Sequence, residues 1–306
     1  MNGRTDDRHA HRKDILRFGG VALVVSFLIT LVSNTAIVLT PSWWGVIIAS
    51  MLILVVGLWD DIRELSWKIQ LVAQVVAGSI AFFFGIRLIS FTNPFGGALF
   101  FDSGWMIGIS FAVTIVWIVA VMNAVNWADG IDGLCGGVSF IGFLTIFFLS
   151  LRPEVNQPPV AIFAVILAGA SLGFLAFNFY PAKIFAGTSG SWFLGFMLAV
   201  LAVFSGTKIA TAVLVLLLPL LDAAWVIFNR FYSGVSIFAP DTRHLHYRLQ
   251  ELGWSSQFIA LFFYSVTIGI AVIALHTNAF EKMIVFISIV FIALVFFIYI
   301  QKQTAR

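Results

Sequence analysis

Ten long apolar runs constrain this chain more than any other feature of its sequence. Each is close to the roughly 20 residues that a helix needs to cross the hydrocarbon core of a membrane, and 61% of the 306 residues are hydrophobic while only 10% are charged. Because lipid offers the backbone no hydrogen-bond partner, such runs must form helices. They lie at residues 21–39, 43–58, 69–85, 105–122, 134–151, 160–179, 192–204, 209–228, 258–275 and 283–300. The sequence therefore predicts an all-α polytopic membrane protein with about ten transmembrane helices.

The basic residues indicate how these spans are oriented. When the connections are assigned alternately to the two sides, one side carries 13 of the 17 Lys and Arg residues, and such an excess marks the cytoplasmic side of a plasma (inner) membrane. We therefore expect both termini, including an N-terminal segment 1–20, and a long loop 229–257 to be cytoplasmic, within a single integral-membrane domain 1–306. Basic residues that flank spans do not indicate a nucleic-acid partner, and a single cysteine, Cys135, excludes a disulfide framework.

Acidic residues gather on the same side, which carries 11 of the 14 Asp and Glu residues although carboxylates contribute little to orientation. The first cluster is Asp60 and Asp61, at the end of the second span. Adjacent carboxylates beside lipid are costly unless a cation or a base neutralises them, so the pair suits Mg²⁺ binding or general-base chemistry. A helix stop, with Ser66 opening the next helix, is the alternative interpretation.

A second cluster combines amide and carboxylate oxygens after the fourth span. Asn123, Asn126, Asp129 and Asp132 lie within ten residues of one another. They carry the hard oxygen ligands that Mg²⁺ prefers, and the glycines among them let a phosphate approach the backbone. Their spacing does not match a calcium-binding EF-hand loop. A plain turn at the membrane surface is the alternative.

The third cluster, residues 187–191, reads Gly-Thr-Ser-Gly-Ser immediately before the seventh span. Small residues at a helix start expose backbone N–H groups to an anion, which the helix dipole also favours. Because Gly and Ser are common at the start of any helix, an ordinary helix start is the alternative.

The fourth cluster is cationic and lies in the loop after the eighth span. Arg243, His244, His246 and Arg248 fall within six residues, and Asp222 lies within or at the end of that span. Such a group suits a pyrophosphate, which Arg can bind through two hydrogen bonds. The alternatives are a zinc site and a basic patch that binds anionic lipid.

All four clusters follow even-numbered spans and therefore lie on one side of the membrane. Carboxylates and amides for a metal, together with cations for phosphates, describe a phosphoryl-transfer site at the membrane surface.

In these residues the chain resembles the polyprenyl-phosphate N-acetylhexosamine-1-phosphate transferases. This family includes the enzymes that start O-antigen and teichoic-acid lipids and the phospho-MurNAc-pentapeptide translocase. The resemblance covers nearly the whole chain and lies in the order and spacing of residues 17–20, the aspartate pair with Ser66, Lys68 and Gln74, and the segments 123–134, 187–195 and 240–249. The run His-Leu-His-Tyr-Arg-Leu at 244–249 is more similar to the GlcNAc-1-phosphate branch of the family.

The resemblance implies transfer of N-acetylhexosamine-1-phosphate, with GlcNAc-1-phosphate favoured, from a UDP-sugar to polyprenyl phosphate. UMP would be released, Mg²⁺ or Mn²⁺ would be the cofactor, and the product would start a lipid-linked cell-surface glycan. By resemblance, the catalytic residues are Asp60, Asp61 and Asp129; the metal site consists of Asn126, Asp129, Asp60, Asp61 and the position of Thr188; and the substrate-binding residues are Asn123, Asp132, Lys68, Arg243, His244 and His246.

Two positions depart from the family's pattern. Thr188 stands where the family has an Asp that binds Mg²⁺, and a neutral hydroxyl is a poorer ligand for a hard dication. Tyr247 replaces a His, but it can still donate a hydrogen bond or stack on a base. The first departure leaves open a catalytically impaired homologue that binds lipid phosphate or nucleotide-sugar.

Two further interpretations concern the whole chain. A secondary transporter is the alternative from another class, but transporter sites lie near the membrane midplane, whereas these ionisable residues, Asp222 excepted, lie at span ends. Small residues and numerous Phe side chains would allow helices of two copies to pair in a homodimer.

Overall fold

The computed structural model describes residues 17–34, 37–204, 209–236 and 243–304. Most of the expected N-terminal segment 1–20 lies outside the described residues, as do residues 237–242 of the expected loop 229–257.

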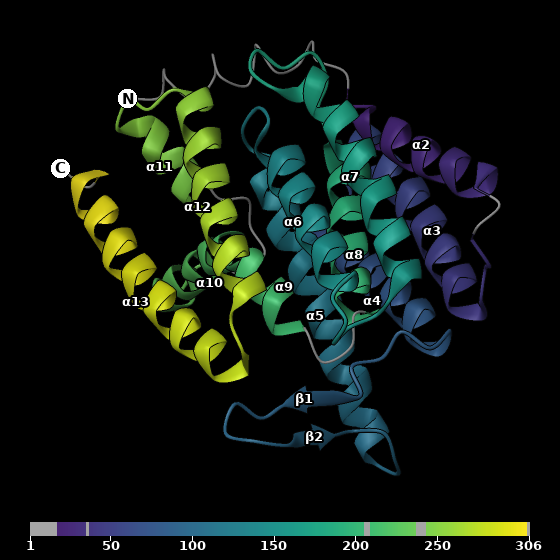
Figure 1. Ribbon diagram of the computed structural model, residues 1–306. Coiled ribbons are helices and arrows are strands. Elements are labelled where there is room, and N and C mark those ends of the chain that lie inside the picture. The colour runs from purple at the N-terminus through teal and green to yellow at the C-terminus, as the bar shows by residue number, and fades with distance from the viewer. Residues whose placement is uncertain (1–16, 35–36, 205–208, 237–242, 305–306) are drawn as a thin grey trace.

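The described residues form a bundle of helices (Figure 1). The helices are α2 (Gly19–Ser33), α3 (Pro41–Arg63), α4 (Trp67–Phe83), α5 (Met106–Ala128), α6 (Leu134–Ser150), α7 (Pro158–Asn178), α8 (Gly187–Phe204), α9 (Ile209–Val215), α10 (Leu217–Tyr232), α11 (Leu245–Glu251), α12 (Ser256–His276) and α13 (Ala279–Thr304). Six of them are long and apolar enough to cross a membrane, and the bent pair α9 and α10 adds a seventh candidate. Helices α2, α4 and α6 are shorter but also apolar. The all-α polytopic class is confirmed, whereas ten crossings stay a prediction.

Helix α8 forms the centre of the bundle. Nearly all its side chains are buried, among them Trp192 and Phe193, and it packs against α2, α3 and α5. Its backbone touches two of these helices through glycines. A Cβ on Gly57 of α3 would lie 2.4 Å from Cα of Ser189, and one on Gly20 of α2 would lie 2.3 Å from Oγ of the same serine. Side chains larger than hydrogen would therefore force these helices apart.

The eighth apolar run differs from a simple span because it is broken. Helices α9 and α10 meet at an angle of 70°, with Leu216 between them. Pro219 lies in the first turn of α10 and has no N–H to donate to the carbonyl of Val215, which its ring also crowds. The proline thus accounts for the break, after which α10 packs against α5.

The two ends of the bundle carry different structures. Strands β1 (Ser90–Thr92) and β2 (Ala98–Phe100) form an antiparallel hairpin in which Phe91 faces Leu99 across the pair. In Figure 1 this hairpin projects from the bottom of the molecule, whereas α11 and the last turns of α13 lie at the top.

Candidate active site

A cavity of about 1130 Å³ lies between α3, α4, α5, α10 and the starts of α8 and α11. Part of its wall is polar and contains Arg17, Asp61, Asn123, Asn126, Asp129, Thr188, Arg230 and His244. The rest is mainly apolar and is formed by α4, α5 and α10, with side chains such as Val75, Val116 and Ile227. Residues from all four polar clusters of the sequence therefore meet in one cavity.

Asp61 faces this cavity and accepts three hydrogen bonds from the start of α8. The donors are the backbone N–H of Thr188 at 2.7 Å, the backbone N–H of Ser189 at 3.1 Å and the hydroxyl of Ser189 at 2.7 Å. The first N–H groups of a helix have no partner within the helix. A carboxylate from α3 thus caps α8, and the dipole of α8 stabilises its negative charge.

Asp60 is buried and does not belong to the cavity wall. Its Oδ1 accepts hydrogen bonds from the side-chain amide of Gln70 and the backbone N–H of Leu65, both at 2.8 Å. Its Oδ2 accepts a hydrogen bond from the hydroxyl of Thr188 at 2.6 Å. The two aspartates therefore have different surroundings, and Thr188 links Asp60 to α8. Gln70 is a site residue that sequence reasoning missed, although it lies between Lys68 and Gln74 of the resemblance.

Gly187 brings a third carboxylate to the same helix start. Its φ is +67°, which favours glycine, and a Cβ there would lie 2.7 Å from the carboxylate oxygens of Asp61. Its N–H donates to Oδ2 of Asp129 at 3.1 Å. One turn further, the hydroxyl of Ser191 accepts a hydrogen bond from the amide of Asn126 at 2.7 Å. The start of α8 thus orients Asp61, Asp129 and Asn126 together.

Three other predicted residues have varied surroundings. Asn123 lines the cavity, and its amide donates to Oε1 of Gln74 at 2.7 Å. Asp132 accepts a hydrogen bond from the backbone N–H of Ala182 at 3.0 Å and is not part of the cavity wall. Lys68 is exposed, also outside the wall, with its Nζ 5.7 Å from the ring centre of Trp67.

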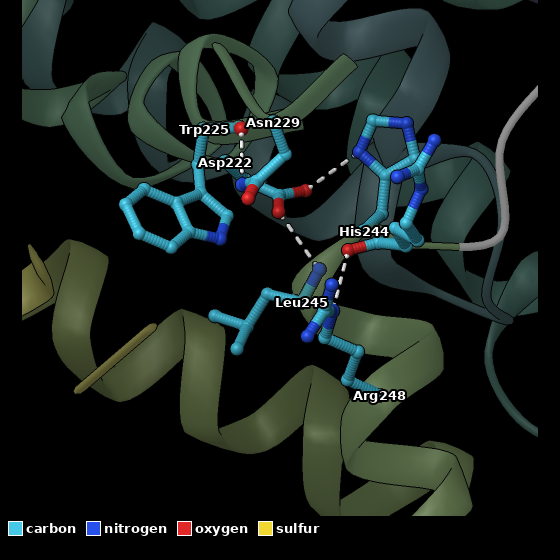
Figure 2. A network of polar contacts seen from close by, with 7 residues as sticks. Asp222, Trp225, Asn229, His244, Leu245 and Arg248 are labelled. Carbon is cyan, nitrogen blue, oxygen red and sulfur yellow. Dashed lines mark hydrogen bonds and ion pairs between the residues drawn. The ribbon is translucent and has the colours of Figure 1, made fainter. Parts of the chain in front are cut away.

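The cationic cluster contributes His244 and the neighbouring Tyr247 to the cavity, but neither Arg243 nor His246. The rings of His244 and His246 lie parallel with centres 5.6 Å apart. His246 is buried beside Gly130, where a Cβ would lie 2.4 Å from its Nε2. Nδ1 of His244 lies 3.0 Å from Oδ2 of Asp222 in α10 (Figure 2). Asp222 was not among the predicted site residues, although a carboxylate inside an apolar run was a signal for it.

Residues 17–20 lie beside the segment that leads into α8, a location that the sequence alone did not predict. The backbone N–H groups of Gly19 and Gly20 donate to the carbonyls of Phe185 and Ala186, at 3.0 and 3.1 Å. These contacts hold the start of α2 against the segment that leads into α8, and they place Arg17 on the cavity wall.

The donor atoms in the cavity suit a magnesium ion whose shell is completed by water and substrate. They do not suit a metal that is held by protein ligands alone. Among the described residues, no group of three or more His, Cys, Asp or Glu side chains is arranged to hold a metal ion. Mg²⁺ is commonly bound by one or two carboxylates, with water and substrate phosphates completing its shell. Asp61, Asp129 and the amide of Asn126, which share the polar wall, supply such a donor set.

The fold and the cavity define a class of protein, a polytopic membrane protein whose carboxylates and cations converge on one polar site. Residues 43–206 match the model of glycosyl transferase family 4. The chain is 30% identical to a probable undecaprenyl-phosphate N-acetylglucosaminyl 1-phosphate transferase of Bacillus subtilis, over 94% of this chain and 82% of the relative. It is 32% identical to a decaprenyl-phosphate N-acetylglucosaminephosphotransferase of Mycobacterium tuberculosis, over 84% and 71%. It is 29% identical to a phospho-N-acetylmuramoyl-pentapeptide-transferase of Geobacillus thermodenitrificans, over 88% and 85%. The chain belongs to glycosyl transferase family 4.

Proposed function

We propose that this protein transfers GlcNAc-1-phosphate from UDP-GlcNAc to polyprenyl phosphate at the cytoplasmic face of the plasma membrane. UMP is released, and the lipid product starts a cell-surface glycan. The observation that carries the proposal is a single cavity with three features. It contains acidic residues that are hydrogen-bonded to the start of α8, it contains His244, and it has an apolar wall. The names of the relatives, which describe transfer of N-acetylglucosamine phosphate to a polyprenyl phosphate, support the same reaction.

The apolar wall accounts for the lipid substrate. Side chains of α4, α5 and α10 line it, among them Leu71, Ile115 and Leu220. Such a surface is as apolar as the lipid around it, so an isoprenoid chain can pack against it without exposing either surface to water. The isoprenoid chain would lie against these three helices, with the lipid phosphate directed to the polar wall.

The polar wall accounts for the transfer itself. An oxygen of the lipid phosphate attacks the β-phosphorus of UDP-GlcNAc, a new P–O bond forms, and the bond to the bridging oxygen breaks so that UMP leaves with that oxygen. Asp61, Asp129 and Asn126 would hold Mg²⁺, which when bound neutralises the charge of the diphosphate. Arg17, Arg230 and His244 are the cavity-lining groups that can bind its oxygens. Asp60 holds Thr188 and through it the start of α8.

UMP release from UDP-GlcNAc by the purified protein with polyprenyl phosphate, titrated with Mg²⁺, tests the proposal. We expect release that requires both the lipid and Mg²⁺, and a loss of about 100-fold or more in Asp61→Asn. Unchanged turnover in Asp61→Asn would contradict the role of that residue.

The second candidate is a catalytically impaired homologue, and one specific contact favours it. The hydroxyl of Thr188 donates its hydrogen to Oδ2 of Asp60 at 2.6 Å, and a neutral hydroxyl is a poorer ligand for Mg²⁺ than the carboxylate of the family's pattern. Donor binding without UMP release at any Mg²⁺ concentration, with release restored in Thr188→Asp, would establish this candidate in place of the first.

A further inference from the structure

The bend between α9 and α10 brings a buried carboxylate to the histidine of the cavity. Asp222 lies three residues after Pro219 and is 6% exposed, and His244 is also 6% exposed. Oδ2 of Asp222 lies 3.0 Å from Nδ1 of His244, and Oδ1 accepts a hydrogen bond from the backbone N–H of Leu245 at 2.7 Å. Figure 2 shows the carboxylate between the imidazole ring and the start of α11.

This contact determines how the imidazole ring is oriented. A buried carboxylate is stable only when its oxygens are hydrogen-bonded, and an ionised carboxylate can only accept. Nδ1 of His244 must therefore carry the proton that points to Asp222. The ring also lies against Trp127, with centres 5.4 Å apart. With Nδ1 engaged, Nε2 on the opposite edge is the ring nitrogen that can serve a ligand in the cavity that His244 lines.

We propose that Asp222 is a positioning residue that acts through His244 on the diphosphate of the sugar donor. The identity of that donor rests on the proposed function. Asp222 holds the ring so that Nδ1 faces the carboxylate and Nε2 faces the cavity. In the imidazolium form both ring nitrogens are donors, so the ring can bridge this carboxylate and a phosphate oxygen. Through Leu245, the same carboxylate fixes the start of α11, which also carries Tyr247 of the cavity wall.

The test is a double-mutant cycle on the full chain in lipid nanodiscs. The Kd of UDP-GlcNAc is measured by calorimetry for the native protein, Asp222→Asn, His244→Ala and the double variant. Asn has nearly the volume of Asp, and its Oδ1 can still accept from Leu245, but its amide nitrogen takes the place of the oxygen that accepts from Nδ1 of His244. Ser255→Ala is the matched control, because it removes the side chain that accepts from Phe258 N–H at the start of α12 and touches no part of the cavity wall.

We expect each single variant to weaken donor binding by about tenfold and the double variant to be no weaker than His244→Ala alone, since interacting residues are not additive. In turnover, Asp222→Asn should raise KM for the donor and leave KM for the lipid unchanged. Ser255→Ala should lower thermal stability without changing the Kd. Unchanged binding in either single variant, or losses that multiply in the double variant, would overturn the proposal.

The same preparations separate this inference from the proposed function. Coupled losses of donor binding in a protein that releases no UMP would support the role of Asp222 and overturn the transferase reaction. A native protein that binds no UDP-sugar would overturn both.

Discussion

The hydroxyl of Thr188 donates a 2.6 Å hydrogen bond to Asp60. The resemblance leads us to expect an Asp at position 188. A hydroxyl can donate where a carboxylate can only accept. The residue therefore stabilises Asp60 without a metal ion, and the acidic pair is held by α8 itself. At the scale of the residue, Thr in place of Asp at position 188 lets the start of α8 be stable without a bound cation.

Removal of this hydroxyl should destabilise the protein. Thr188→Val keeps the shape of the side chain but leaves the buried Oδ2 of Asp60 without that donor, at a cost of about 1–3 kcal/mol in the free energy of unfolding. Thr188→Ser retains the donor and is the matched control. A thermal melt in detergent should show a lower Tm for the valine variant only, and equal Tm values in the two variants would count against the importance of the bond.

Introduction of a carboxylate at the same position should make stability depend on a cation. In Thr188→Asp the new side chain faces Asp60 at hydrogen-bond distance, and two carboxylates so close repel each other unless a cation lies between them. We expect a lower Tm than native without Mg²⁺ and a larger rise in Tm when Mg²⁺ is added, since a ligand stabilises the state that binds it. A Mg²⁺-induced shift no larger than that of the native protein would contradict this expectation.

At the scale of the element, the approach of α3 to α8 sets the geometry of the site. Asp61 can reach the first N–H groups of α8 because the backbones of these helices touch at Gly57 and Ser189. Helix packing at such distances depends on small residues in membranes. The position of the Asp61 carboxylate is therefore a property of a helix pair and not of one motif.

A single methyl group at this contact should disturb the site. In Gly57→Ala the new Cβ would lie 2.4 Å from Cα of Ser189, so the helices must separate, at a cost of about 1–3 kcal/mol. We expect a lower Tm and UMP release reduced about tenfold or more, since a displacement of about 1 Å at a reacting centre is costly. Gly173→Ala is the control, because a Cβ on that glycine of α7 would have no neighbour within 4 Å among the described residues. Equal activity in the two variants would show that the contact does not position Asp61.

At the scale of the whole molecule, the bundle has one end with the hairpin and another with α11 (Figure 1), and charge predicts that the latter is cytoplasmic. The single native cysteine, Cys135, is 1% exposed, which gives a silent background for labelling. A membrane-impermeant maleimide should label Phe95→Cys in sealed right-side-out vesicles, and Glu251→Cys only after permeabilisation. Labelling in the reverse order would invert the predicted topology.

The sequence predicted the fold better than it predicted the site. Apolar runs and polar clusters are local patterns, so the ten helical segments and the grouping of Asp61, Asn126 and His244 could be anticipated. The pairing of Asp222 with His244 depends on the bend between α9 and α10. Pro219 is the local signal for that bend, and it does not specify which residues the bend brings together. The different surroundings of Asp60 and Asp61 depend on which side of α3 faces α8. Gly57, one turn before Asp61 on the same face of α3, indicates that side only once its contact with α8 is known.

The burial of α8 also has a consequence for how the protein is made. This helix is the least apolar of the six long candidates for a span, and it begins with small polar residues. It therefore gains less from lipid than the other five, and its buried contacts form only once α2, α3 and α5 are in the membrane to receive it. Helices α2, α3 and α5 precede it in the chain, so synthesis supplies them first. A nascent chain that stops before α8 has the acidic residues but no helix start to gather them, so catalytic competence should appear at a late step of membrane insertion.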